Sequence, residues 1–197
     1  MTTKEALLQA IAGTNRGLLA DPQTQGYIER TVTELEAQSP HPQPLQSPEI
    51  NGVWRLLYTT SQELLQIDRF PLFKLGQIYQ CIFAETNTIY NIAEVQGLPY
   101  LDGLISVSAK FTVVSDLRVS VAFDRAVFGL QRLANYQSPA QLVEQMRAGP
   151  LTALDFPIRR QNQRGWLEVT YLDADLRMGR GNAGSLFVLS KAAQFQV

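Results

Sequence analysis

From residue 105 onward, apolar and polar side chains alternate along several short segments of the chain. Every second position of residues 105–113 is apolar, and serine, lysine and threonine fill the positions between. The same period of two returns in residues 119–123 and 166–171. Successive side chains of a β-strand point to opposite faces of a sheet, so this pattern predicts strands with one apolar face. Because such faces must be buried, the pattern favours a mainly β domain with one core.

The same criteria extend the predicted sheet to both sides of this region. One helix interrupts it, because Ser138-Pro139 is a typical helix start and Gly149-Pro150 a typical stop. About eight or nine short strands with tight turns favour a closed or nearly closed antiparallel barrel. The further strands are expected at residues 51–60, 76–84, 87–95, 175–180 and 185–190.

The N-terminal part of the chain lacks this alternation. Residues 1–38 are predicted to form a helical hairpin, with Thr3 capping the first helix and Asp21 capping the second. Residues 39–50 contain four prolines, which disrupt both helices and sheet ladders, so an extended linker is predicted there. The barrel then occupies residues 51–197 as the single functional domain. The expected fold class is therefore α+β, mainly β with short helices.

The first predicted strand of the barrel has Gly52 near its start, and Trp54 follows two residues later. A glycine and a tryptophan at this spacing are typical of lipocalins, whose barrels enclose small apolar molecules. The sequence therefore predicts a lipocalin-like barrel with an apolar ligand inside. Inward-facing side chains of a barrel form its core and also line any cavity, so both roles remain open for them. The candidates for lining the cavity are Trp54, Leu56, Tyr58, Phe111, Val121, Phe123, Val169 and Tyr171.

Two arginines in a late predicted strand, Arg177 and Arg180, are candidates for closing one end of the barrel. A guanidinium that lies over the indole of Trp54 would gain roughly 0.5–2 kcal/mol. Two other roles remain open for these arginines. They would pair with Asp173 or Asp175, or they would hold the polar head group of a ligand.

The residues that usually carry catalysis or bind nucleic acid and metals are missing. The net charge is −1, so there is no strong positive field for a nucleic acid. The only histidine, His41, lies in the linker, and the only cysteine, Cys81, lies in a predicted strand. Residues 179–184 match G-x-G-x-x-G, but a strand-like run follows, so a hairpin turn is predicted and not a dinucleotide site. We therefore expect no enzyme, no cofactor, no metal and no nucleic-acid partner.

Several blocks of the sequence resemble the plastid lipid-associated protein (PAP)/fibrillin family. The resemblance covers about residues 4–190, and its most specific part is the C-terminal block. It implies a lipocalin-like domain of cyanobacteria and chloroplasts that associates with plastoglobules and thylakoid membranes. It also implies a link to carotenoids, to prenylquinones such as plastoquinone, and to protection against photo-oxidative stress. The family has no established catalytic residues to carry over. The blocks are residues 52–61, 76–82, 91–95, 171–182 and 186–189.

Three hypotheses for the function follow. The first is a carrier that binds or sequesters an apolar lipid or isoprenoid in its barrel. The second is a structural coat on a membrane or lipid droplet, with residues 1–38 lying on the surface and an empty barrel. The third is an accessory partner of an enzyme of prenyl-lipid synthesis.

The expected location follows from the ends of the chain and from its hydropathy. The N-terminus resembles neither a signal nor a transit peptide, and no apolar run approaches the ~20 residues of a membrane span. These features predict a cyanobacterial-type member on the cytoplasmic side, soluble or peripherally attached to the thylakoid membrane. A processed chain in a plastid is the other interpretation.

Overall fold

The computed structural model describes residues 2–62, 74–97, 101–158 and 164–193. Three α-helices are found among these residues: α1 (Thr3–Ala12), α2 (Pro22–Glu36) and α4 (Pro139–Ala148). Short 3₁₀ turns are η1 (Pro44–Gln46), η2 (Pro48–Ile50) and η4 (Asn182–Gly184). The strands are β1 (Gly52–Thr59), β2 (Lys74–Phe83), β3 (Thr88–Gln96), β4 (Gly103–Val113), β5 (Arg118–Leu130), β6 (Leu154–Pro157), β7 (Arg164–Leu172), β8 (Leu176–Gly181) and β9 (Leu186–Ala193).

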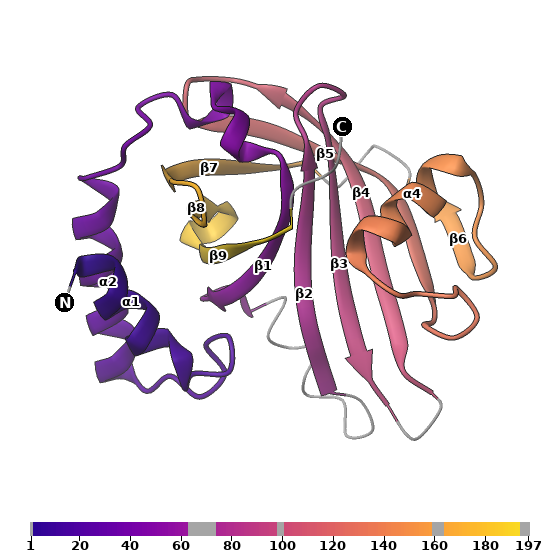
Figure 1. The fold of residues 1–197 in the computed structure, drawn as a ribbon, viewed down its shortest axis with the longest axis horizontal. Coiled ribbons are helices and arrows are strands. Elements are labelled where there is room, and N and C mark those ends of the chain that lie inside the picture. The colour runs from indigo at the N-terminus through magenta and orange to yellow at the C-terminus, as the bar shows by residue number, and fades with distance from the viewer. Residues whose placement is uncertain (1, 63–73, 98–100, 159–163, 194–197) are drawn as a thin grey trace.

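Eight antiparallel strands form a closed ring, in the order β1-β2-β3-β4-β5-β7-β8-β9 and back to β1 (Figure 1). The ninth strand, β6, lies outside the ring and pairs with the second half of β5. The ring is not a regular barrel. The predicted antiparallel β fold with an N-terminal helix pair is confirmed.

Two of the joins in the ring are short. β1 pairs with β2 only from Gly52 to Arg55, although both strands continue beyond this point. β5 changes its partner along its length: Arg118–Ala122 pair with β7, whereas Arg125–Phe128 pair with β6. The ring therefore consists of one sheet of long strands, β2 to β5, which β6 extends at its edge, and a second sheet of β7, β8, β9 and β1.

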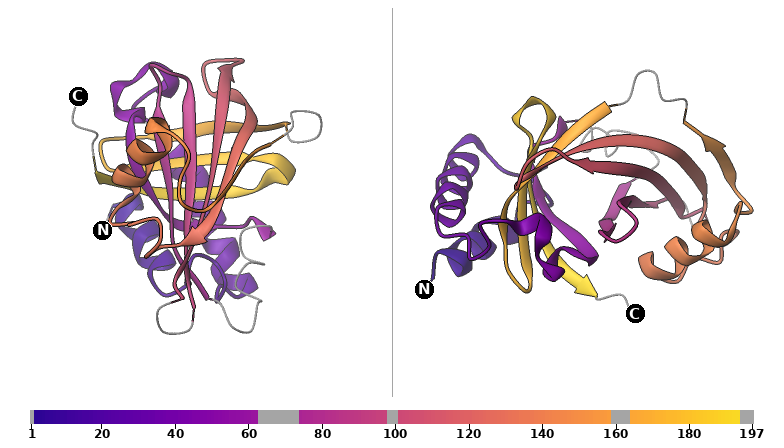
Figure 2. Two further views of the ribbon diagram at one scale, coloured as in Figure 1. Left: turned by 90° about the vertical axis from the view of Figure 1, so that its right-hand side faces the viewer. Right: turned by 90° about the horizontal axis from the view of Figure 1, so that it is seen from above.

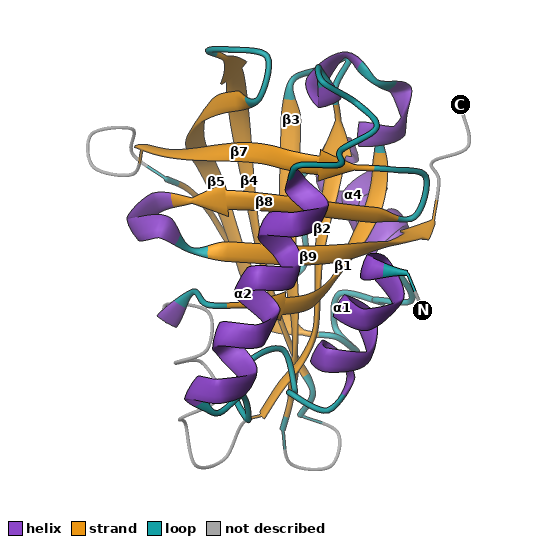
Figure 3. Cartoon of the chain, turned by 90° about the vertical axis from the view of Figure 1, so that its left-hand side faces the viewer, coloured by secondary structure: helices purple, strands orange, loops and turns teal. Residues whose placement is uncertain are grey.

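The N-terminal helices cover the outer face of the second sheet, where they lie across β8, β9 and β1 (Figure 3). Apolar residues at helical spacing, such as Leu7 and Ile11 of α1 and Ile28 and Val32 of α2, are fully or almost fully buried there. This burial explains why two short helices are stable, since tertiary packing of one face supplies most of the stability of such helices. The cap of α1 is Thr2 and not Thr3 as predicted.

Helix α4 covers the outer face of the first sheet, on the opposite side of the molecule from α1 and α2 (Figure 2). Its predicted cap, Ser138, accepts a hydrogen bond from the backbone N–H of Gln141. Leu142, Val143 and Met146 pack on a strand face that includes Cys81. The outer faces of both sheets are therefore buried under helices. The side chains that alternate with the outward-facing ones point into the interior of the ring.

The proline-rich segment differs from the predicted extended linker. It contains the 3₁₀ turns η1 and η2, and Pro44 and Ile50 in these turns are buried. Proline is compatible with the first position of a helical turn, because the N–H that it lacks would be unpaired there anyway. The segment therefore packs against the domain and its proline content alone was a poor guide to its conformation.

The glycine motif forms the turn between β8 and β9, as predicted. Gly179 and Gly181 belong to β8, and Gly184 ends η4 with a φ of +72°. A side chain at position 179 would place its Cβ 2.6 Å from the backbone oxygen of Glu168. Close packing of neighbouring strands therefore accounts for Gly179.

Candidate functional site

The interior of the ring is lined by one large apolar cluster. Five of the eight predicted cavity residues belong to it, and a sixth packs against it. Trp54 and Leu56 come from β1, and Val169 comes from β7 on the other side of the ring. Phe123 lies at the margin of the cluster and is only partly buried. The six residues in or against the cluster are Trp54, Leu56, Phe111, Val121, Phe123 and Val169.

The other two predicted cavity residues, Tyr58 and Tyr171, lie outside the ring, so the prediction for them is corrected. Both pack in the cluster formed with α1 and α2. The strand pairings are irregular between Leu56 and Tyr58 and between Val169 and Tyr171. A β-bulge shifts the alternation by one residue, so side chains beyond it change to the opposite face.

The indole of Trp54 closes one end of the interior. Its side chain is fully buried, and Nε1 donates a hydrogen bond of 2.9 Å to the backbone oxygen of Ile50 in η2. The ammonium group of Lys191 lies 4.1 Å from the ring centroid and donates hydrogen bonds to the backbone oxygens of Glu49 and Asn51. The 3₁₀ segment before β1 is thereby fixed over this end of the ring.

Arg177 projects into the interior from β8. Its Cζ lies 5.2 Å from the centroid of the Trp54 ring, as predicted from the sequence. Its Nη2 donates a hydrogen bond to Oε1 of Gln80, and Nε2 of Gln80 donates one of 2.9 Å to Oδ1 of Asn91. Among the described residues, Nη1 of Arg177 has no hydrogen-bond partner and no carboxylate forms an ion pair with this side chain. Burial lowers the pKa of Arg177 to about 9, so the guanidinium is still cationic at neutral pH.

Arg180 has a different role from Arg177. Its Nε and Nη2 donate hydrogen bonds of 2.9 and 2.8 Å to the carboxylate of Glu36 in α2. This bidentate pair attaches α2 to the outside of β8, so Arg180 neither closes the ring nor faces a ligand in it. Asp173 and Asp175, the predicted partners of the arginines, both pair with Lys4 of α1 instead.

A row of apolar side chains connects the interior with the open edge of the first sheet. Residues directly opposite each other on antiparallel strands point to the same face. Ile78 and Ala93, which belong to the interior cluster, are 7% and 8% exposed, whereas Phe128 and Leu154 at the far end are 38% and 71% exposed. We call this set the apolar row: Ile78 on β2, Ala93 on β3, Ile105 on β4, Phe128 on β5 and Leu154 on β6.

A second exposed aromatic side chain lies beside the end of this row. Phe156 on β6 stacks on Phe128, with ring centroids 5.8 Å apart and planes inclined by 10°. The register pairs Phe156 with Ala126, which lies opposite Val107 on β4, so Phe156 also lies on the inner face. We call Phe128, Leu154 and Phe156 the apolar edge. Exposed apolar groups at the end of a buried apolar surface mark a place where a lipid can enter or a partner can bind.

One cavity lies inside the ring beside Arg177. Its volume is about 60 Å³, which is enough for one or two water molecules or a small head group. Gln80, Arg177 and Glu168 are its polar lining residues, and the carboxylate of Glu168 is paired with Arg118. Side chains such as Leu167, Phe187 and Leu189 form an apolar wall. The cavity as it stands is therefore too small for a whole isoprenoid.

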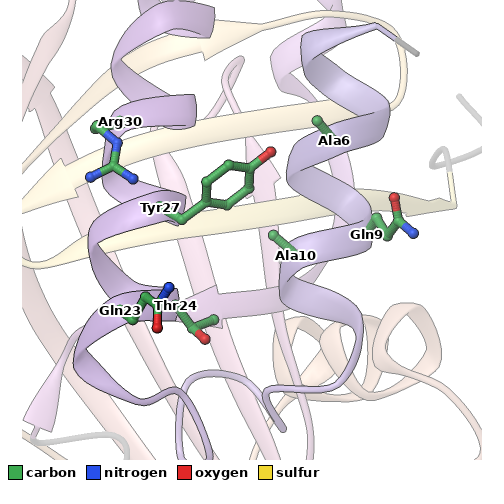
Figure 4. Close-up of a pocket in the computed structure, with 7 residues that line it drawn as sticks. All are labelled: Ala6, Gln9, Ala10, Gln23, Thr24, Tyr27 and Arg30. Carbon is green, nitrogen blue, oxygen red and sulfur yellow. The ribbon is translucent and has the colours of Figure 1, made fainter.

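A larger depression of about 440 Å³ lies between α1 and α2 on the surface of the molecule (Figure 4). Tyr27 points across it from α2 toward α1. Gln9, Gln23 and Arg30 give it a mixed polar lining. Such a lining does not suit an apolar ligand, so the interior of the ring is the better candidate site.

Sequence reasoning did not find Gln80, Asn91 or the apolar edge. Gln80 and Asn91 are polar residues in strands, and only the register places them opposite each other on the inner face. β6 is a four-residue strand without clear alternation, so no periodic signal marked Leu154 and Phe156. The one signal that the sequence offered for the apolar edge was the presence of apolar residues after the predicted helix of residues 138–149.

The comparisons with known proteins agree with the resemblance in the sequence. A family model described as PAP_fibrillin matches residues 1–190. The chloroplastic light-induced protein of Solanum tuberosum is 33% identical over 217 residues, which cover 95% of this chain and 66% of that protein. The chromoplast-specific carotenoid-associated protein of Cucumis sativus is 31% identical, with 95% and 67% covered. Plastoglobulin-1 of Pisum sativum, named as chloroplastic, is 32% identical, with 95% and 60% covered.

The chain thus spans about two thirds of the length of these relatives. No solved structure matches it. Among the described residues, the helices are too short or too polar to cross a membrane. Because the family model covers nearly the whole chain, and relatives at about one third identity align over 95% of it, the chain belongs to the PAP_fibrillin family of plastid lipid-associated proteins.

Proposed function

We propose that the protein binds a single apolar lipid or isoprenoid in the interior of its strand ring. The observation that carries the proposal is the apolar row, which runs without a polar interruption from the buried interior to the exposed Leu154. The opposite end is closed by Trp54 and the side chains around it. A ligand therefore enters at the apolar edge and moves toward Trp54.

The ligand has to displace side chains, because the interior cavity measures only about 60 Å³. Side chains at the margin of the interior cluster, such as Ile105, Phe123 and Phe187, are partly buried and have the least packing to lose. Removing apolar ligand surface from water stabilises a complex by about 25 cal/mol per Å². A long isoprenoid exposes several hundred Å², so the gain can exceed the cost of association and of rearranging these side chains.

The names of the relatives support this class of ligand. One relative is called carotenoid-associated and others are called plastid lipid-associated or plastoglobulin. We propose that the ligand is a carotenoid, a prenylquinone such as plastoquinone, or a related lipid. The protein would then act in a plastid, or at a thylakoid membrane if the chain is cyanobacterial, in protection against photo-oxidative stress.

The fluorescence of Trp54 tests the proposal. Trp166 is the other tryptophan and lies under the guanidinium of Arg118, so the measurement uses the Trp166→Phe variant. Plastoquinone and β-carotene are titrated separately, and a saturable change in emission at micromolar ligand is expected. A flat titration with both ligands would contradict the proposal.

A substitution within the apolar row makes the test specific. Ala93 is 8% exposed and lies in the middle of the row, so Ala93→Phe fills the interior and should abolish binding. Overpacking costs about 1–3 kcal/mol of stability, so circular dichroism has to show that the variant is still folded. Ala12→Phe, at an exposed position of α1, is the matched control and should bind as the wild type does.

A second candidate function is contact with a lipid surface through the apolar edge. The apolar faces of α1 and α2 are buried against the ring, so these helices do not offer them to a membrane. Phe128, Leu154 and Phe156, in contrast, are exposed together on the inner face of the first sheet. A lipid surface covering this edge would deliver the ligand directly to the apolar row.

Flotation with liposomes of neutral plastid-type galactolipids tests this contact. Leu154→Asp should reduce the bound fraction severalfold, because a charge would have to leave water at the surface. Leu19→Asp is the control, since Leu19 has the same exposed fraction, 71%, at a site remote from the edge in the sequence and in the helical part of the fold. Equal loss in both variants would contradict a specific role of the apolar edge.

A further inference from the structure

We propose that the ring interior contains a head-group site at Arg177, and that the preferred ligand is an amphiphile with an ionised carboxylate, such as a long-chain fatty acid. This inference rests on the proposed function, because it assumes that a lipid enters the ring. It goes beyond that function by naming the polar group of the ligand, its partner in the protein, and the direction in which the ligand lies.

The first argument is the unbalanced charge. Arg177 is almost completely buried and remains cationic at neutral pH, since its pKa stays near 9. Gln80 accepts one of its hydrogen bonds, but an amide oxygen brings no negative charge. Among the described residues, no carboxylate forms an ion pair with Arg177. A buried charge without a counter-ion is costly, so an anion that binds beside it is strongly favoured.

The second argument is the free donor. Nη1 of Arg177 has no hydrogen-bond partner within the described parts of the chain, although it is shielded from solvent. A buried donor left unpaired keeps the full cost of its desolvation. Packing on Trp54 accounts for the flat face of the guanidinium but does not satisfy this N–H. A role in closing the ring therefore leaves part of the side chain unexplained.

The third argument is the shape and chemistry of the space beside Arg177. The cavity of about 60 Å³ is lined by the polar residues Arg177, Gln80 and Glu168 and by an apolar wall that includes Leu167, Phe187 and Leu189. The carboxylate of Glu168 is paired with Arg118. Phe187 and Leu167 are partly buried members of the interior cluster, so this wall continues into the apolar surface of the ring. The cavity fits a carboxylate and the first carbons of its chain. The rest of the chain then extends along the apolar row toward the apolar edge.

A carboxylate suits this site better than a neutral carbonyl. Both can accept the hydrogen bond of Nη1, but only the carboxylate also neutralises the charge, and charge-assisted pairs with arginine are the stronger ones. A neutral quinone or an alcohol is therefore expected to bind in the same ring with lower affinity. Comparison of an acid with its own ester separates the two contributions.

Calorimetry with palmitate below its critical micelle concentration and with methyl palmitate below its solubility limit tests the inference. The wild-type protein should bind palmitate at least about tenfold more tightly than the ester, as expected for a charge-assisted hydrogen bond. Arg177→Met keeps the length and apolar stem of the side chain but removes the charge and the donors. In this variant, the preference for the acid should disappear, because the acid loses far more affinity than the ester, which loses only the hydrogen bond to its carbonyl.

Replacing a buried charge with an apolar side chain of similar size is often neutral for stability, so the Arg177→Met variant is expected to fold. Arg180→Met is the matched control, because Arg180 lies on the same strand but outside the ring, and it should retain the preference for the acid. Arg177→Lys keeps the charge and should retain part of the preference. It tests the proposal independently if the methionine variant is unstable.

The outcomes separate this inference from the proposed function. Equal affinity of the wild-type protein for acid and ester, or a preference that survives in Arg177→Met, overturns the head-group site and leaves the carrier function intact. A crystal structure with only ordered water on Nη1 after soaking with palmitate overturns it as well. If neither palmitate, its ester nor plastoquinone binds, the carrier function and the head-group site both fail.

Discussion

The guanidinium of Arg177 lies over the indole of Trp54, and its Cζ is 5.2 Å from the ring centroid. Lys191 places a second cation 4.1 Å from the same centroid. Each such contact can contribute roughly 0.5–2 kcal/mol when it is shielded from water. Because Trp54 also donates a hydrogen bond to Ile50, one side chain joins β8, β9 and the 3₁₀ segment before β1. The closed end of the ring is therefore held by polar contacts around a single indole.

Lys191 makes the closed end sensitive to pH. Burial lowers the pKa of Lys191 from 10.5 to about 8, and Arg177 contributes in the same direction while Glu49 opposes it. Loss of the ammonium charge next to the indole should change the emission of Trp54. We therefore expect a transition with a midpoint near pH 8 in the Trp166→Phe background, measured by fluorescence.

The same shift predicts the direction of a change in stability. Between pH 8 and 10.5 the unfolded chain keeps a proton on Lys191 that the folded chain has released. Raising the pH through this window should therefore increase the free energy of unfolding. Lys191→Met should remove the fluorescence transition near pH 8 and reduce this slope, whereas Lys74→Met at an exposed position should preserve both. Part of the slope remains in Lys191→Met, because Arg177, with its pKa lowered to about 9, titrates in the same window. A transition that persists in Lys191→Met would assign it to another group.

Apolar packing, and not the ion pair with β8, should dominate the attachment of α2. Ile28 is fully buried between α2 and the ring, so Ile28→Ala should cost about 2–5 kcal/mol in the free energy of unfolding. Arg180→Met removes the bidentate pair with Glu36, which lies at the margin of the contact, and should cost about 1 kcal/mol or less. Urea denaturation of the two variants measures the difference. A larger loss in Arg180→Met would contradict this order.

Asp155 should stabilise the attachment of β6 in a way that depends on pH. Its carboxylate accepts hydrogen bonds of 2.7 and 2.6 Å from Arg125, which also donates to the backbone oxygens of Met146 and Gly149 at the end of α4. Asp155→Asn should lower the free energy of unfolding by about 1–3 kcal/mol at pH 7. Faster hydrogen exchange in residues 150–157 would show that the loss is local.

The hydrogen bond from Arg125 lowers the pKa of Asp155 below its ordinary value of 3.8. The stabilisation by Asp155 is therefore complete above about pH 4 and is lost as the pH falls through the lower value in the folded protein. Urea denaturation between pH 2 and pH 5 should show a smaller acid dependence in Asp155→Asn than in the wild type. Identical profiles would mean that the pair does not contribute to folding.

Cys81 should be protected from alkylation until the protein opens. It is fully buried under α4, and burial raises the pKa of its thiol from 9 to about 12. At pH 8 this shift lowers the thiolate fraction about a thousandfold, before any steric protection is counted. Labelling with iodoacetamide, followed by mass spectrometry, should be slow in buffer and rapid in urea. Leu142→Ala, which opens the packing of α4 on this face, should accelerate labelling without denaturant, and fast labelling of the wild type would contradict the buried position.

The sequence predicted the strands well because their side chains alternate regularly between the two faces of each sheet. The positions of Tyr58 and Tyr171 could not be predicted, since each follows a bulge that moves later side chains to the other face. The sequence could have predicted that Arg177 and Arg180 lie on opposite faces of the sheet, because residues three apart in a strand point to opposite faces. What the sequence alone could not provide is the register, and only the register places Gln80 beside Arg177.

The short joins of the ring have a mechanical consequence. β1 separates from β2 after Arg55, and β5 leaves β7 after Ala122. Within the described parts of the chain, no ladder of backbone hydrogen bonds fixes the spacing of the two sheets beyond these points. The two sheets can then move apart at this side of the ring while every strand pairing remains intact. A ligand much larger than the resting cavity can be admitted at the cost of side-chain packing and of side-chain hydrogen bonds between the sheets, such as the one from Arg177 to Gln80. The protein regains its closed form when the ligand leaves.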